Sequence, residues 1–259
     1  MTSPLHEDEA EAPGGQAVPG GRAATGTSST TGGSHAQTLS RGITMLEILA
    51  DADAPMSIAE VAAALGVHRS IAYRILRTLE EHSLVVRDDA GKLMSGPGLA
   101  TLARSVARSL QSASLPMLTE LSTDLGLTAF VAVWDHADCV TLVTVEPPAR
   151  GATIRPGTRH SFSVGAPGIA IQSAISEEQW SAVDPTSPYR SEALRARELG
   201  YAVSHDEVIP DVGAIAAPIR RIGQTPAALA VLYLGERDDT AQIGRRLVET
   251  ANRIEDQLA

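Results

Sequence analysis

The sequence LGVHRSIAYRILRTLEE, residues 65–81, decides how the N-terminal part of the chain is interpreted. Gly66 and Val67 predict a turn, and Ser70 is the expected N-cap of a helix that runs to about Glu81. Helical spacing turns one apolar stripe inward, and its members are Ala72, Ile75, Leu76 and Leu79. Three arginines and a histidine are left on the outward side and at the turn. The pattern indicates a face that meets an anionic partner, with a merely solvated charged face as the alternative.

The segments around this helix predict a small winged module. LSRGITMLEILAD (39–51) places Leu39, Ile43, Leu46 and Leu49 at helical spacing. Ser57, with Glu60 three residues later, forms the capping box of a second helix. LVVRDDAGKLMS (84–95) predicts two short strands around an Asp-Asp-Ala-Gly turn. Three helices followed by a hairpin make a winged helix-turn-helix, which we assign to residues 37–98.

Charge is distributed unevenly along the chain. The whole sequence carries 21 Lys and Arg against 31 Asp and Glu, a formal net charge of −10, which argues against a protein that coats nucleic acid over its whole surface. Residues 37–100 hold six basic and eight acidic residues, a net charge of −2, but three of the six cations lie between residues 69 and 77. One local basic face is therefore compatible with an acidic protein.

The helix of residues 70–81 is placed to read DNA. The second helix of a helix-turn-helix pair enters the major groove with its N-terminal residues leading. Arginine reads guanine through two hydrogen bonds, and Ser, Tyr and Arg side chains hold phosphates. We expect DNA contacts from Ser57, His68, Arg69, Ser70, Ile71, Tyr73, Arg74, Arg77, Arg87 and Lys92. Because so small a footprint binds weakly, we expect two modules on a pseudo-palindromic double-stranded operator, and hence a dimer.

The remaining composition excludes several classes of protein. The single cysteine, Cys139, rules out an internal disulfide and a Cys-rich zinc site and fits a reducing, cytoplasmic compartment. No apolar run reaches the roughly 20 residues that span a bilayer, and the N-terminus lacks the order of a signal peptide. No catalytic residue or cofactor is expected, because no catalytic or nucleotide-binding motif appears. No metal site is expected either, because the cluster at residues 205–207 is better explained as a solvated strand end.

Three parts of the chain follow from these patterns. Residues 1–36, rich in Gly, Ser, Thr, Pro and Ala, predict a disordered tail before the winged module. A linker helix is predicted from Leu99 to about Gln111, at the start of a second domain over residues 99–259. Strand-like runs such as LTAFVAVWD (127–135) alternate with helical segments such as APGIAIQSAI (166–175). The fold class is therefore α+β, with one antiparallel sheet and helices on its faces.

Two segments resemble the IclR family of bacterial transcriptional regulators. The first is QTLSRGITMLEIL followed by SIAEVAAALGVHRSIAYRILRTLEEHSLV, within residues 37–85, and the second is GYAVSHDEVIPDVGAIAAPI, residues 200–219. The resemblance covers about residues 37–259. It implies a GAF-like or profilin-like domain that senses small molecules, assembly as dimers or as dimers of dimers, and repression rather than activation. In the recognition helix Ile71 replaces a typical Thr, which favours contact with a thymine methyl.

The resemblance also implies an effector site, which we place at Ala166, Gly168, Ile169, Ser204, Ala214, Ala216 and Tyr233. Polar anchors common in the family are changed, since Ile169 stands where Lys is typical, Ala214 where many members have Cys, and Ser204 where some have an acid. An effector larger or more apolar than a keto acid is therefore expected. Two alternatives stay open: a C-terminal domain that serves only oligomerisation or protein interaction, and, ranked last, an enzyme that carries a DNA-binding module.

Overall fold

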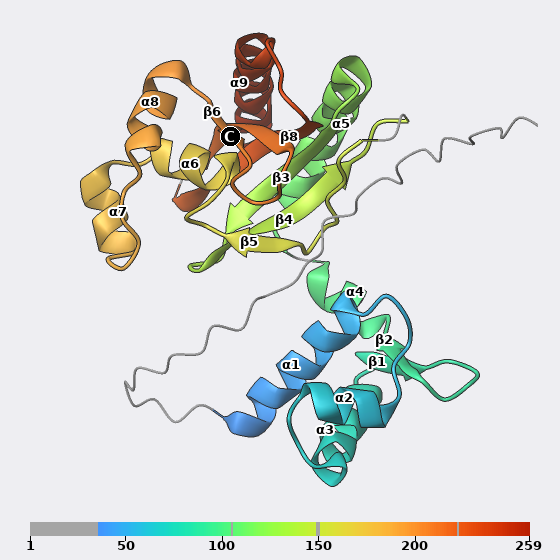
Figure 1. Ribbon diagram of the computed structural model, residues 1–259. Coiled ribbons are helices and arrows are strands. Elements are labelled where there is room, and N and C mark those ends of the chain that lie inside the picture. Colours follow the sequence, from blue (N-terminus) through green and yellow to red (C-terminus); the bar gives the residue numbers. More distant parts are fainter. Residues whose placement is uncertain (1–35, 105, 149–150, 222) are drawn as a thin grey trace, which may run out of the picture. The chain divides into compact units, whose positions relative to one another are not determined.

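The computed structural model describes residues 36–104, 106–148, 151–221 and 223–259 (Figure 1). Two compact units divide the described chain, the first ending at Arg108 and the second beginning at Ser109. Residues 1–35 of the predicted tail lie outside the described residues. No helix within the described ranges is long and apolar enough to cross a membrane.

The first unit contains the winged helix-turn-helix that the sequence predicts, but it extends beyond residue 98 and includes α4, which was predicted to belong to the second domain. Its elements are α1 (Gln37–Asp51), α2 (Ile58–Ala64), α3 (Arg69–Glu81), β1 (Val85–Arg87), β2 (Leu93–Ser95) and α4 (Gly98–Ala103). β1 and β2 pair antiparallel, with Val86 opposite Met94. The predicted inward stripe of α3 is buried, and it packs with Met45, Val61 and Leu93 into one core. Each element therefore buries one apolar face against the others.

The caps of α2 and α3 differ from each other. Ser57 accepts a hydrogen bond from the backbone N–H of Glu60, and the Glu60 carboxylate accepts one from the N–H of Ser57, so the predicted capping box is confirmed. The prediction of Ser70 as the cap of the next helix is wrong. α3 begins at Arg69, and the His68 ring accepts a hydrogen bond from the N–H of Ser70. The imidazole nitrogen satisfies the Ser70 amide, an orphan N–H of the first turn that lies earlier in the chain than the amides a Ser70 cap would have reached.

The inward face of α1 matches only half of the stripe that the sequence indicated, since Leu49 is buried and Leu46 packs against the core but the two earlier members are exposed. Leu39 and Ile43 are 65% and 50% exposed, whereas Gly42, Met45 and Leu49 are buried. The exposed set with Leu39 and Ile43 and the buried set with Gly42 and Met45 both have helical spacing. Packing against α3 favours the set with Gly42, because a glycine there lets the Ile75 side chain approach closely. An apolar strip of α1 is consequently left on the surface of this unit.

The predicted linker helix from Leu99 to Gln111 is wrong as a single element. α4 ends at Ala103 and α5 begins at Arg108, and Ala107 has a φ of 42°. A residue in this left-handed region cannot continue an α-helix, so the helical path is interrupted. α5 then runs on to Leu125, well beyond the predicted end.

The second unit contains a six-stranded antiparallel sheet with helices on its faces, as predicted. Its elements are α5 (Arg108–Leu125), β3 (Thr128–Trp134), β4 (Asp138–Val145), β5 (Arg159–Ser161), α6 (Ala166–Ser173), α7 (Glu177–Val183), α8 (Ser191–Leu199), β6 (Ala202–His205), β7 (Val212–Arg221), β8 (Gln224–Leu234) and α9 (Thr240–Leu258). The strand order is β5-β4-β3-β8-β7-β6, so strands from both ends of the unit meet at its centre. β5 and α7 were not predicted from the sequence.

Small residues on the central strands let one helix lie directly on the sheet. Ala214 and Ala216 of β7 and Ala228 and Ala230 of β8 belong to the same core cluster as α6. All eight residues of α6 are buried. On the opposite face, α9 packs on β7 through Ile243, Leu247 and Ile254, and Arg246 of α9 pairs with acids of α5 (Figure 1).

Two Gly→Ala changes in helices are predicted to act in opposite directions. A Cβ at Gly168 would lie 2.1 Å from the carbonyl oxygen of Phe162, so Gly168→Ala should lower the free energy of unfolding by about 1–3 kcal/mol. A Cβ at Gly42 would meet only Ile75 Cγ2 at 3.7 Å, so Gly42→Ala should raise it by about 0.5–1 kcal/mol. Thermal unfolding followed by circular dichroism measures both. Equal effects at the two sites would contradict this packing.

Candidate DNA-binding face and candidate effector site

The outward face of α3 carries the basic residues that the sequence singled out. Arg69, Tyr73, Arg74 and Arg77 are exposed, and within the described residues no carboxylate lies within ion-pair distance of Arg74 or Arg77. Arg69 lies over the Tyr73 ring, with Cζ 5.7 Å from the ring centroid, and this cation–π contact ties together two side chains at the leading end of the helix. The structure thus brings four predicted DNA-binding residues onto one solvent-facing surface.

His68 and Ser70 form a linked pair at the start of α3. Nδ1 of His68 lies 2.9 Å from Oγ of Ser70 and also accepts from the Ser70 N–H. Because Nδ1 acts as an acceptor, the proton of the neutral ring lies on Nε2. The exposed ring can therefore donate a hydrogen bond outward while it caps the helix.

The side chains of three other predicted DNA-binding residues make contacts within the winged module itself. Ile71 is half-buried and packs against the core, so its side chain is only partly free to meet a thymine methyl. The Ser57 hydroxyl serves the capping box of α2. Arg87 donates from Nε to Glu80 Oε1 at 2.7 Å and from Nη1 to the Gly91 carbonyl at 3.1 Å. Arg87 therefore fastens the wing to α3 and fixes the turn, while Lys92 is exposed on the wing.

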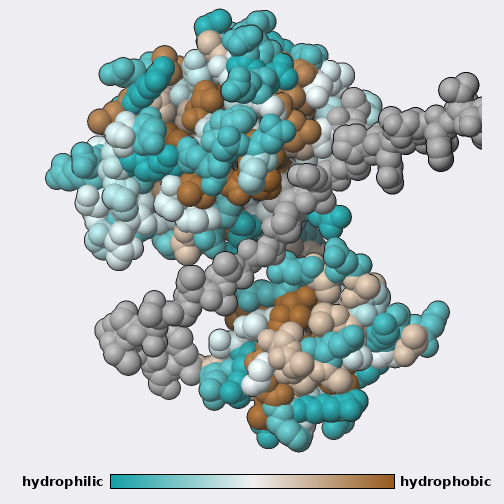
Figure 2. All heavy atoms as spheres, viewed as in Figure 1, coloured by the Kyte–Doolittle hydropathy of each residue, from teal (hydrophilic) through white to brown (hydrophobic). Residues whose placement is uncertain are grey.

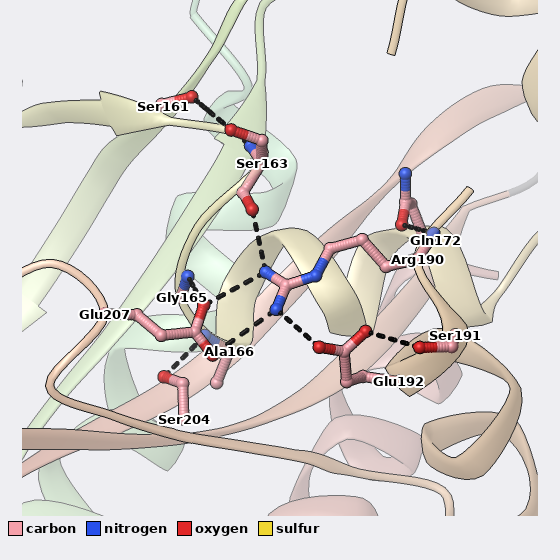
Figure 3. Close-up of polar contacts among 10 residues, drawn as sticks. All are labelled: Ser161, Ser163, Gly165, Ala166, Gln172, Arg190, Ser191, Glu192, Ser204 and Glu207. Carbon is pink, nitrogen blue, oxygen red and sulfur yellow. Dashed lines mark hydrogen bonds and ion pairs between the residues drawn. The ribbon is translucent and has the colours of Figure 1, made fainter. Parts of the chain in front are cut away.

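In the second unit, the N-terminus of α6 is bonded to side chains from β6 and the segment after it (Figure 3). The N–H of Gly165 donates to Glu207 Oε2 at 2.8 Å, and the N–H of Ala166 donates to Ser204 Oγ at 2.8 Å. A carboxylate at this position is stabilised by the positive end of the helix dipole. The Glu207 carboxylate therefore lies at the N-terminus of the buried helix, where a bound anion would otherwise be stabilised.

Arg190 holds that carboxylate in place. Its guanidinium donates to both oxygens of Glu207, at 3.1 and 3.3 Å, and to the Ser163 carbonyl at 2.8 Å (Figure 3). Arg190 also pairs with the half-exposed Glu192 at 3.1 Å, and the hydrogen bond from Arg190 lowers the pKa of Glu192 to about 2. Sequence reasoning missed this cluster because its members come from separate segments with no common period.

Positively charged and hydrogen-bond-donating side chains lie at the C-terminus of α6. Arg197 of α8 donates from Nε to the Ser173 carbonyl at 3.0 Å, and also donates to the Ile175 carbonyl. The Tyr189 hydroxyl donates to the Gln172 carbonyl at 3.1 Å. Cations and donors at this end complement the negative end of the dipole.

The structure gathers most of the predicted effector residues on one face of the sheet. Ala166, Ile169, Ala214 and Ala216 belong to one buried cluster with α6. Gly168 and Ser204 are buried beside it, at the close contact with Phe162 and at the Ala166 amide respectively.

Tyr233 is the exception, and grouping it with this site is wrong. It pairs with Gly213, whereas Ala214 pairs with Leu232, and successive strand residues point to opposite faces. Its ring occupies the space where a Cβ on Gly213 would lie, near the ring of His205. Tyr233 therefore lies on the sheet face opposite α6.

Comparisons with known proteins match this architecture. The model of the IclR helix-turn-helix domain matches residues 38–89. The HTH-type transcriptional regulator Rv1719 of Mycobacterium tuberculosis is 27% identical over 216 residues, covering 78% of this chain and 83% of the relative. The HTH-type transcriptional repressor AllR of Escherichia coli K12 is 25% identical over 215 residues, covering 76% and 79%. The chain is thus similar to regulators rather than to enzymes.

Solved structures show the same fold. An IclR transcriptional regulator from Alicyclobacillus acidocaldarius superposes with a TM-score of 0.72 at 23% identity, covering 87% of this chain and all of the other. An IclR homolog from Microbacterium hydrocarbonoxydans, complexed with 4-hydroxybenzoate, superposes with a TM-score of 0.72 at 21% identity, covering 85% and 98%.

Neutralising Glu207 should destabilise the second unit more than neutralising Glu192. Glu207→Gln keeps an acceptor for Gly165 but removes the charge that Arg190 and the helix dipole stabilise, so we expect a loss of about 1–3 kcal/mol of unfolding free energy. Glu192→Gln removes a mostly exposed partner of the same arginine and should cost less than about 1 kcal/mol. Urea unfolding of both variants checks this order, and the reverse order would contradict it.

Proposed function

We propose that this chain, which belongs to the IclR family of transcriptional regulators, represses genes by binding operator DNA and releases or tightens that binding when an effector occupies its second unit. The exposed face of α3 carries the proposal, since Arg74 and Arg77 project from a well-capped helix of the winged module. Repression is supported by relatives that include the repressor AllR of Escherichia coli and the acetate operon repressor of Salmonella typhimurium. Because the target is chromosomal DNA, we place the protein in the cytoplasm.

Arg74 and Arg77 have separable roles in this proposal. Arg74 lies one turn from the start of α3, where the leading residues of a recognition helix meet base edges. Arg77 lies further along the helix and is assigned to a phosphate, as are Arg69, His68 and Lys92. Arg87 supports the wing through Glu80 and Gly91, so its effect on DNA binding is indirect.

We propose that two copies act together. Leu39 and Ile43 of α1 and Leu102 of α4 are all at least half-exposed, and apolar residues gather over α1 on the visible face of this unit (Figure 2). Apolar surface of this kind marks interaction sites. A second copy that covers it would pair two recognition helices for a pseudo-palindromic operator, and further pairing would give a dimer of dimers.

A small-molecule effector is supported by the structural neighbour that was solved with 4-hydroxybenzoate. We place its site on the α6 face of the sheet, beside Ala166, Ile169 and Ala214. One observation favours the alternative of a domain that serves only assembly: Glu207 and Ser204 already occupy the free amides of α6.

Removing single arginines should affect DNA binding in two ways. Arg74→Ala should weaken operator binding by about 5- to 150-fold and relax sequence preference at one position, since a bidentate base contact is worth about 1–3 kcal/mol. Arg77→Ala should weaken binding to all sequences and reduce the slope of log affinity against log salt by about 1. Electrophoretic shift titrations on the upstream region of its gene, at several salt concentrations, measure both.

Arg245→Ala is the matched control, because it removes an exposed arginine from α9 in the second unit. It should leave affinity and salt slope unchanged. If Arg74→Ala and Arg77→Ala behaved like this control, α3 would not be the DNA-reading helix.

Charges on the exposed strip of α1 should separate the copies. Leu39→Glu with Ile43→Glu should shift the protein toward monomers in sedimentation velocity, because an interface cannot bury unpaired carboxylates at low cost. Val183→Glu, at an apolar residue of similar exposure in α7, is the control. Dissociation by the control and not by the α1 pair would refute this interface.

A further inference from the structure

The turn between β6 and β7, residues 206–211, begins and ends on a left-handed backbone. Asp206 has a φ of 59° and Asp211 a φ of 63°. Aspartate visits this conformation when its short side chain bonds locally. Here the N–H of Asp211 donates to Oδ1 of Asp206 at 2.6 Å, and the N–H of Asp206 donates to the Val212 carbonyl at 3.2 Å. The Asp206 carboxylate therefore closes the turn that it begins.

His205, the last residue of β6, connects this turn to the end of β8. Its Nε2 lies 3.0 Å from the Gly235 carbonyl oxygen, and its Nδ1 lies 3.0 Å from Oδ2 of Asp206. The N–H of Gly235 also donates to the Asp211 carbonyl at 2.9 Å. One oxygen of Asp206 thus faces the imidazole, while the other holds the Asp211 amide.

Packing on the sheet face opposite α6 restricts the His205 ring. His205 pairs with Gly213 of β7, and Gly213 pairs with Tyr233 of β8, so the side chains of this row share one face. The two rings approach across the glycine, with their centroids 6.1 Å apart. A Cβ on Gly213 would lie 2.1 Å from Cζ of Tyr233, so only glycine leaves room for this arrangement. The imidazole consequently keeps one nitrogen toward each acceptor.

Both partners of the His205 ring can only accept hydrogen bonds. A backbone carbonyl and an ionised carboxylate carry no proton, and a neutral imidazole has a single N–H. Only the imidazolium can donate to Gly235 and to Asp206 at once. A neutral ring loses one of these bonds and turns a lone pair toward an acceptor.

The charges that face the ring favour the imidazolium. The hydrogen bond to the Gly235 carbonyl, with the carboxylates of Asp206 and Asp211, raises the pKa of His205. From β8 the ring faces the Tyr233 phenol, whose pKa is raised by burial, and β7 places only a glycine here. Because the folded pKa is raised, the stabilising contribution of the imidazolium is complete below the ordinary histidine value of about 6.5. It is lost as the pH rises through the folded value.

We propose that protonated His205 clasps the turn of residues 206–211 to the end of β8, and that loss of its proton at rising pH loosens the turn. Glu207 lies in the same turn, but the Gly165 amide and the Arg190 guanidinium hold it separately, and neither group titrates near neutral pH (Figure 3). The turn therefore has one pH-dependent and one pH-independent attachment. This device goes beyond the proposed function and does not depend on DNA binding.

Amide hydrogen exchange of the full chain between about pH 5.5 and 8.5, followed by mass spectrometry, tests the proposal. Protection is taken relative to the intrinsic exchange rate at each pH. Protection of the turn, which includes the Asp211 amide, should fall about 3- to 10-fold as the pH rises, because about one hydrogen bond is lost. Protection of the Gly165 amide should stay constant. His205→Gln bridges only one acceptor and does not titrate, so its turn should be loosened at every pH.

Two further variants separate the clasp from a general effect of pH. Asp206→Asn keeps an oxygen for the Asp211 amide and suits the left-handed backbone, but it removes the charge opposite Nδ1. It should move the transition to lower pH. His136→Asn removes an exposed histidine from the turn between β3 and β4, also at a positive φ, and should leave the transition unchanged.

An NMR titration of the imidazole signals measures the protonation of His205 directly. A His205 ring that titrates no higher than the ordinary value of about 6.5 would overturn the clasp. Turn protection that does not change with pH would overturn it as well. The same holds if His205→Gln keeps the pH dependence of the unmodified chain, because another group would then be the one that titrates.

Discussion

A fully buried helix whose two ends are matched by charge is the constraint on which the second unit depends. Every residue of α6 lies in the core, so water cannot satisfy its terminal amides and carbonyls. Glu207 and Ser204 take the amides at one end, and Arg197 and Tyr189 serve the other. These partners come from β6, α8 and the segments beside them, so the whole α6 face is organised around one helix axis. Arg190 completes the arrangement by pairing with Glu207.

The first unit solves a different electrostatic problem, because an acidic protein must present a surface to a polyanion. Its cations are used unequally. Arg87 makes internal hydrogen bonds to Glu80 and Gly91, which hold the wing against α3. Arg74 and Arg77 project freely from α3. A small number of well-placed cations suffices when two modules share a site, since each phosphate contact adds to affinity on its own.

The sequence predicted features that depend on local spacing and missed those that depend on distant partners. The Ser57 capping box, the inward stripe of α3 and the antiparallel sheet follow from short patterns. Either stripe of α1 has helical spacing, and only contact with α3 decides which is buried. Tyr233 was assigned to the wrong sheet face because its side-chain direction follows from pairing with Gly213. The pair of Arg190 and Glu207 joins residues 17 positions apart with no periodic signal.

The histidine cap of α3 has a consequence for how a DNA-reading helix is begun. Aspartate is among the preferred N-caps, but its carboxylate would place a negative charge where phosphates approach. The His68 imidazole performs the same capping task with a neutral acceptor, and its second nitrogen is left as a donor. Helix stability and attraction for a polyanion, which compete at an acidic cap, are therefore served by one side chain.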